Sequence, residues 1–171
     1  MKTLILYFHI FLFAGLSHSC QKINIGQNGT VDLYLLEKYS TINQSCRIDE
    51  NSVKTEKEPI IKYEDLLLYD NETYTFQLSE KAAETVKNLH PSVYGLPFAI
   101  KANDELIYTG YFWPSYSSAS CSWITIDPVM MEDNKIIVKK GYPGQIEGEI
   151  IPDKRNDERI LSIFRKDKKL R

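Results

Sequence analysis

The chain has 171 residues, a length typical of one domain, or of one domain with an address segment. Hydrophobic residues make up 43% of it and charged residues 26%, which excludes collagen-like, low-complexity and wholly disordered chains. The formal net charge of −2 gives no overall basic excess, so we expect no nucleic-acid partner.

Residues 1–19 have the pattern of a secretory signal peptide, with one positive charge, an apolar run over residues 4–16 and small residues before Cys20. The run is shorter than the roughly 20 residues with which a helix crosses a bilayer. A buried N-terminal helix is the alternative, but the run shows no amphipathic period or N-cap. We therefore expect a removed signal peptide, a tether over 20–29 and a single domain over 30–171.

Cys20 directly follows the small residues, and the segment resembles a bacterial lipoprotein signal. In that family the cysteine is lipidated and becomes the first residue of the mature chain, which implies a membrane partner through the N-terminal lipid. Gln21 in place of an aspartate implies the outer membrane. The alternative is secretion without lipid, with Cys20 as a free thiol, because Ser17 stands where the family prefers leucine.

Setting Cys20 aside leaves Cys46 and Cys121, an even number of cysteines, which in an exported protein predicts a disulfide. The bridge would close a loop of about 75 residues and stabilise the fold by about 4 kcal/mol in the loop-entropy model. Three cysteines allow three different bridges, and the absence of any bridge is the main alternative. We expect the pair Cys46–Cys121.

Three N-glycosylation patterns, which begin at Asn28, Asn43 and Asn71, leave a eukaryotic secreted glycoprotein as a competing interpretation. In a chain this rich in Asn, Ser and Thr, one or two such matches arise by chance.

Apolar and polar residues alternate in several short segments, which predicts strands. In chain order these cover residues 31–39, 73–78, 98–102, 105–112, 121–126 and 135–140. Ser79 and Asp157 are the expected N-caps of two helices, the first ended by Pro91. Asn103-Asp104 has the composition of a two-residue hairpin turn. We expect an α+β fold, with a mostly antiparallel sheet, helices on one face and a β-α-β-β unit over 73–112.

Residue types that carry catalysis are scarce. After the signal peptide, His90 is the only histidine that could serve a serine-histidine-acid triad, and its place at a helix end favours interaction with the helix C-terminus. One histidine and two distant cysteines do not make a zinc site, and no glycine-rich phosphate loop occurs. We expect a non-enzymatic protein without cofactor or metal.

Residues 108–123 are unusually rich in aromatic and serine residues. Alternation along a strand places Tyr111 and Trp113 on the face opposite Tyr108 and Phe112, so both faces carry aromatic rings. Either both faces are packed, or the segment is an exposed platform for a glycan or an extended peptide. The candidate binding residues are Tyr111, Trp113, Tyr116 and Trp123.

Residues 154–171 contain 8 basic and 3 acidic residues, whereas the rest of the mature chain is acidic. Such asymmetry indicates either contact with an acidic partner or an anionic membrane, or a solvated helix face followed by a frayed terminus.

Residues 59–117 resemble the periplasmic head region of the SecD export component. The resemblance lies in Tyr63-Glu64-Asp65-Leu66, Tyr74-Thr75-Phe76-Gln77-Leu78 and Gly95-Leu96-Pro97-Phe98-Ala99-Ile100. It implies a β-α-β-β head and no export motor, because the membrane-spanning segments of that family are missing from the sequence. The chain also resembles short uncharacterised bacterial lipoproteins, over residues 110–118 and 151–157, which supports the envelope location.

Together these patterns favour a lipid-anchored envelope protein that binds a protein partner or a glycan through the aromatic and serine-rich segment. The alternative is a periplasmic inhibitor or immunity-type protein that blocks an envelope enzyme, with the bridge between Cys46 and Cys121 stiffening a blocking loop.

Overall fold

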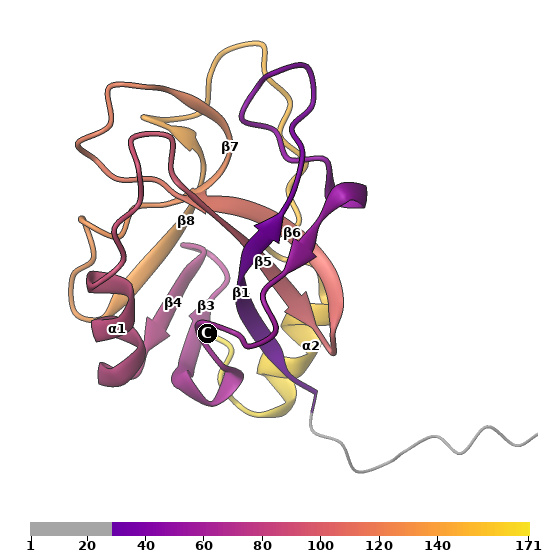
Figure 1. The fold of residues 1–171 in the computed structure, drawn as a ribbon. Coiled ribbons are helices and arrows are strands. Elements are labelled where there is room, and N and C mark those ends of the chain that lie inside the picture. The colour runs from indigo at the N-terminus through magenta and orange to yellow at the C-terminus, as the bar shows by residue number, and fades with distance from the viewer. Residues whose placement is uncertain (1–28) are drawn as a thin grey trace, which may run out of the picture.

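The structure is a computed structural model that describes residues 29–171 (Figure 1). The expected signal peptide, Cys20 and nearly all of the tether lie outside the described residues. The strands are β1 (Val31–Lys38), β2 (Lys54–Thr55), β3 (Leu66–Asp70), β4 (Thr75–Leu78), β5 (Leu96–Ala102), β6 (Glu105–Phe112), β7 (Cys121–Ile126) and β8 (Lys135–Tyr142). The helices are α1 (Glu80–Lys87) and α2 (Glu158–Lys166), with short 3₁₀ helices at Glu50–Ser52 and Tyr63–Asp65.

The eight strands form one sheet in the order β2-β1-β5-β6-β7-β8-β4-β3. Every neighbouring pair is antiparallel except β6 and β7, which run parallel. The predicted α+β class with a mostly antiparallel sheet is confirmed. The β-α-β-β order is present as β4-α1-β5-β6, but β4 pairs with β3 and β8, so three strands separate it from β5 in the sheet.

Local sequence signals explain the helix starts and the hairpin. The Ser79 side chain accepts a hydrogen bond from the backbone N–H of Ala82, and Asp157 caps α2 in the same way. Asn103 and Asp104 both have positive φ, at 51° and 65°, as a two-residue hairpin turn requires. Pro91 does not end the first helix, because α1 stops at Lys87.

Two strands had no clear signal in the sequence. β3 begins with three consecutive leucines and carries a bulge between Leu66 and Leu68, so its side chains do not alternate regularly. β2 has only two residues and lies within the charged stretch 47–58, whose composition predicts a surface loop. Its pairing partner β1 holds it at the sheet edge.

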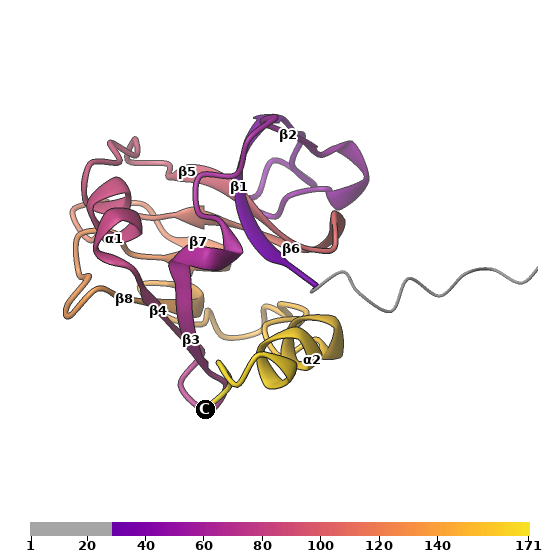
Figure 2. The ribbon, with the colours of Figure 1, turned by 90° about the horizontal axis from the view of Figure 1, so that it is seen from below.

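The sheet is strongly curved (Figure 2). Residues 59–65 cross from β1 to β3: Ile61 pairs with Leu33 of β1, and the backbone N–H of Tyr63 donates to Asp32 Oδ1 at 2.9 Å. Both helices contribute buried side chains to the same hydrophobic cluster within this curve, including Val86 from α1 and Phe164 from α2.

The C-terminal residues are not frayed, which corrects that interpretation of the basic tail. The backbone N–H of Tyr69 in β3 donates to Lys169 O at 2.8 Å, and the N–H of Arg171 donates back to Tyr69 O at 2.9 Å. Lys169 Nζ also donates to Leu66 O at 2.8 Å. The tail therefore covers the outer edge of β3, which would otherwise expose unpaired backbone groups.

Candidate functional site

Two loops that lie far apart in the sequence meet above α1 in the view of Figure 1. Tyr116 Oη donates to Pro91 O at 2.8 Å, and Ser117 Oγ donates to Val93 O at 2.6 Å. We call residues 91–95 and 114–120 together the loop surface.

The loop surface presents apolar and aromatic side chains to solvent without any charged residue. Tyr94 is 72% exposed, Tyr116 is 61% exposed and Val93 is 45% exposed. Tyr116 is therefore the one predicted binding residue whose side chain is exposed. The sequence analysis missed Val93 and Tyr94, although their segment carries the proline and glycine of a turn beside uncharged apolar residues.

The other three predicted binding residues are buried, which corrects the expectation that they form an exposed platform. Tyr111, Trp113 and Trp123 are at most 5% exposed. The Trp113 ring meets the Tyr111 ring edge to face at 5.9 Å and lies 6.3 Å from the Tyr142 ring, while Trp123 Nε1 donates to Thr109 Oγ1 at 3.0 Å. Both faces of this part of the sheet are therefore covered, and these buried rings form the base on which the neighbouring loops pack.

The loop surface is held in one conformation by several tight contacts. Gly95 has a φ of +78°, and a Cβ atom there would come within 2.8 Å of the Trp113 ring. Tyr142 Oη donates to Ser115 O at 2.8 Å. Because glycine alone fits this backbone and this close approach, the loop 91–95 can pack directly on the indole.

A third loop, residues 39–47, is fixed by the disulfide between Cys46 and Cys121, whose Cα atoms are 5.6 Å apart. The predicted pairing of these two cysteines is present in the structure. Tyr39 and Ile42 are 41% and 37% exposed on this loop, and the Tyr39 ring packs edge to face on Tyr111. The bridge ties the loop to the start of β7.

A cavity of about 240 Å³ lies where β6 and β7 diverge; we call it the Tyr108 cavity. These two strands are in register only at Tyr111 with Thr125 and Phe112 with Ile126, so their earlier halves separate. The cavity is lined by both apolar and charged residues: Ile42, Arg47, Ile48, Asp49, Glu50, Asn51, Tyr108, Trp123, Ile124, Pro152 and Lys154. Among the described residues the hydroxyl of Tyr108 is buried with no hydrogen-bond partner, and burial raises its pKa well above the ordinary value.

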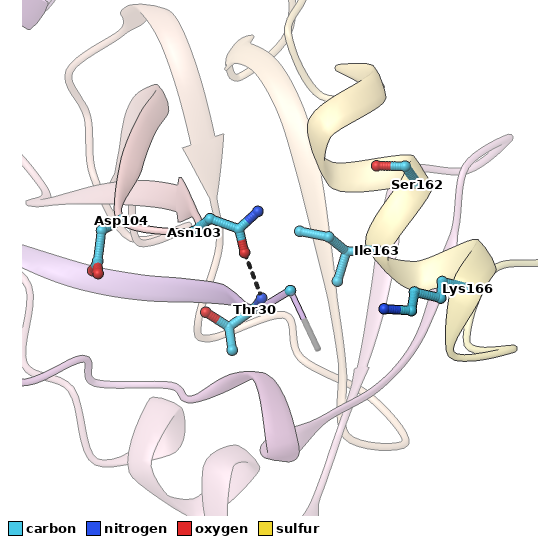
Figure 3. Close-up of a pocket in the computed structure, with 7 residues that line it drawn as sticks. Thr30, Asn103, Asp104, Ser162, Ile163 and Lys166 are labelled. Carbon is cyan, nitrogen blue, oxygen red and sulfur yellow. Dashed lines mark hydrogen bonds between the residues drawn. The ribbon is translucent and has the colours of Figure 1, made fainter. Parts of the chain in front are cut away.

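A larger cavity of about 520 Å³ lies between the hairpin turn, the start of β1 and α2 (Figure 3). Asn103 Oδ1 already accepts a hydrogen bond from the Thr30 N–H at 3.0 Å, while Ser162 and Lys166 are exposed. The cavity borders Gly29, where the described residues begin. Its polar groups are therefore either paired or in solvent, and none is held buried toward a ligand.

Side chains that can ligate a metal are dispersed over residues 29–171. No group of three or more His, Cys, Asp and Glu residues there could hold a metal ion, and His90 is exposed beyond the end of α1. No helix in this part of the chain is long and apolar enough to cross a membrane.

Comparison with known proteins found no matching family model, no matching curated protein and no matching solved structure.

Proposed function

We propose that this chain is an exported, non-enzymatic envelope protein, anchored by a lipid on Cys20, that binds a protein partner through the loop surface. The pattern of residues 1–20 supports export and anchoring. The disulfide between Cys46 and Cys121 is consistent with this, because such bonds persist in oxidising compartments.

The observation that carries the proposal is the exposure of Val93, Tyr94 and Tyr116 on a rigid surface without charges. Cores of protein interfaces are depleted of charged residues and enriched in tyrosine, which often contributes most of the binding energy. A surface already fixed before binding loses less conformational entropy on association. The contacts of Gly95 with Trp113 provide this rigidity.

A protein partner fits the exposed apolar and aromatic side chains of Val93, Tyr94 and Tyr116 better than a glycan does. The hydroxyls of Ser92, Tyr116 and Ser117 each donate to a backbone carbonyl within the two loops. Sugar recognition needs polar side chains that are free to bond the ligand, in addition to aromatic faces. The largest outward side chains on the loop surface are those of Val93, Tyr94 and Tyr116, beside the exposed Ser118 and Ser120.

Co-purification from detergent-solubilised envelopes tests this proposal, with Tyr94→Ala/Tyr116→Ala compared with wild type. The matched control is Leu67→Ala, which removes a side chain that is 49% exposed on β3. We expect a stoichiometric partner with wild type and the control, and its loss with the double variant. Equal recovery with all three proteins would contradict the proposal. If wild type instead binds a glycan array and the double variant does not, the surface binds sugars.

Anchoring is tested separately by metabolic labelling with a fatty-acid analogue. We expect the label on the wild-type chain and none on Cys20→Ala, because the thiol of Cys20 is the acylation site in the proposed scheme. Labelling that persists in Cys20→Ala would contradict lipidation at this residue while leaving the loop surface unaffected.

A second candidate function is inhibition of an envelope enzyme through the loop 39–47. This loop exposes Tyr39 and Ile42 and is fastened by the disulfide, as a rigid blocking loop would be. An inhibitor lowers a cell-wall hydrolase activity at stoichiometric amounts, and Ile42→Asp would abolish that effect. Full hydrolase activity in the presence of excess protein would contradict an inhibitory function.

A further inference from the structure

Residues 165–171 carry a charge opposite to that of the rest of the domain. Five of them are basic and Asp167 is their only acidic residue, which gives a net charge of +4, whereas residues 30–164 carry a net charge of −8. Asp167 is partly buried and accepts a hydrogen bond from the Tyr63 hydroxyl at 2.9 Å. We call residues 165–171 the basic segment.

Two lysines of the basic segment are exposed and have no charged partner within residues 29–171. Lys166 is the last residue of α2 and Lys168 follows it, and neither side chain makes an ion pair or a hydrogen bond there. The dipole of α2 favours cations in its last turn, which accounts for Arg165 and Lys166 but not for Lys168. Lys62 and Glu64, on either side of Tyr63, are both exposed and offset each other.

The acidic residues around α2 lie toward its first turn. Asp157 and Glu105 both pair with Arg159, at 2.7 and 2.6 Å, and Asp104 is exposed in the same turn as Glu105. Glu158 reaches the basic segment only through an exposed contact of 3.4 Å, which contributes little. The helix is about 13 Å long, more than the screening length of about 8 Å at physiological salt, so its acidic start does not cancel its basic end.

The basic end of α2 lies where the chain enters the described fold. Lys166 and Thr30 line the same cavity (Figure 3), and a Cβ atom at Gly29 would come within 2.8 Å of the Ile163 side chain on α2. Cys20 precedes Gly29 by nine residues. Because an extended chain spans at most about 3.6 Å per residue, a lipid on Cys20 would hold this end of α2 within roughly 30 Å of the bilayer.

We propose that the basic segment docks on the anionic phospholipid headgroups of the bilayer to which Cys20 is anchored, an inference that rests on the anchoring proposed above. Each Lys or Arg close to an anionic membrane strengthens binding about fivefold. The tether adds Lys22 and no acidic residue. Docking turns α1 and the loop surface, which lie on the other side of the molecule from α2 in Figures 1 and 2, away from the membrane, where a protein partner can reach them.

The test measures which side of the molecule approaches a charged bilayer. Residues 21–171 carry an N-terminal hexahistidine that binds a nickel-chelating lipid, so the chain is held at the vesicle whether or not Cys20 is lipidated in cells. A thiol-reactive dye is attached through Ser162→Cys on α2 or, as the matched control, through Ser118→Cys on the loop surface; both serines are exposed, and the bridged cysteines do not take the dye. Quenching by a headgroup spin label is compared in vesicles of phosphatidylcholine alone and of phosphatidylcholine mixed two to one with phosphatidylglycerol.

We expect the dye on α2 to be quenched more strongly in the mixed vesicles than in phosphatidylcholine, and the difference to disappear at high salt. The dye on the loop surface should be quenched weakly in both. Lys166→Gln/Lys168→Gln lowers docking about 25-fold, a factor of five for each lysine, and returns the quenching on α2 to its value in phosphatidylcholine. The matched control, Lys81→Gln/Lys87→Gln, neutralises two exposed lysines of α1 and leaves the quenching unchanged.

Three results would overturn the proposal. Equal quenching on α2 in the two kinds of vesicle means that the basic segment does not recognise lipid charge. Equal quenching at the two dye positions means that the chain has no fixed orientation on the bilayer. Equal effects of the two double variants mean that the overall charge, and not the basic segment, is responsible. The comparison of the two vesicles with the unsubstituted lysines decides the question even if a variant fails to fold, and lipidation of Cys20 is decided separately by the labelling experiment.

Discussion

Two aromatic regions of this molecule are built from similar residues and differ in how their polar atoms are used. In the first, which we call the α2 cluster, Tyr63, Tyr69, Phe76 and Phe164 pack with ring centroids 4.4–5.8 Å apart. Tyr63 Oη donates to Asp167 Oδ2 at 2.9 Å, and Tyr69 Oη donates to backbone and side-chain oxygens of residues 155 and 156.

In the second region, beneath the loop surface, Tyr111, Trp113 and Tyr142 form a row of rings. Among the described residues Trp113 Nε1 is buried without a partner, and Tyr94 and Tyr116 above it are exposed. The α2 cluster satisfies its hydroxyls inside the protein and buries every ring, which favours stability. The loop region leaves apolar surface outside, which is what a binding surface requires.

Removal of a ring from the α2 cluster should have the largest effect on stability. Phe164 is fully buried against three other rings, so Phe164→Ala creates a cavity and costs about 4 kcal/mol of unfolding free energy. Urea denaturation followed by circular dichroism measures this. In the loop region Tyr94→Ala should change the value by less than about 0.5 kcal/mol; similar losses for both variants would remove the distinction between the two regions.

Loss of the disulfide should have the next largest effect. Cys46→Ser/Cys121→Ser frees the loop 39–47 and removes a cross-link over 75 residues, which costs at most about 4 kcal/mol, the value of the loop-entropy model. The double variant and the wild-type protein are compared by urea denaturation with and without reductant. Reductant should lower the stability of wild type alone; an effect of the same size on the double variant would show that the bridge is not its target.

Two tyrosine variants compare a buried hydroxyl that is hydrogen-bonded, in the α2 cluster, with a buried hydroxyl that is not. Tyr69→Phe leaves the acceptors on Arg155 and Asn156 unpaired in a buried place and should cost about 1.5 kcal/mol. Tyr108→Phe removes a hydroxyl that has no protein partner and should leave stability unchanged or slightly higher. Thermal and urea unfolding of the two variants side by side check this. A larger loss of stability for Tyr108→Phe than for Tyr69→Phe would contradict this difference between the two hydroxyls.

The smallest expected effect is a dependence of stability on pH beside the α2 cluster. Hydrogen bonds from Arg155 hold the pKa of Asp153 below its ordinary value of 3.8. The carboxylate therefore contributes stability that is complete above that value and is lost as the pH falls through it toward the lowered pKa of the folded state. The free energy of unfolding, measured from about pH 6 to about pH 2 to bracket the ordinary value of 3.8, should fall less steeply for Asp153→Asn than for wild type. An identical slope would contradict this coupling.

The sequence predicted the elements that depend on local signals. Ser79 and Asp157 as caps, and the turn at Asn103 and Asp104, act through groups only a few residues away, so they are visible in the sequence. β3 was missed because its strand character comes from pairing with β4 and with the C-terminal residues rather than from its own pattern.

The candidate site was predicted only in part for a related reason. Alternation placed aromatic rings on both faces of β6, but whether they are exposed depends on what covers them. Trp113 is covered by Gly95 and Tyr142, which are distant in sequence, and only Tyr116 projects from the loop. The Tyr108 cavity results from the divergence of two parallel strands, which no local pattern encodes.

Site-specific photo-crosslinking in intact cells tests most directly whether the loop surface is the binding surface. A photoreactive residue is placed at Tyr94 in one strain and at Ile137, which is 46% exposed on β8, in another. We expect a discrete crosslinked partner from position 94 and none from position 137. Crosslinks from position 137 alone, or the same products from both positions, would contradict it.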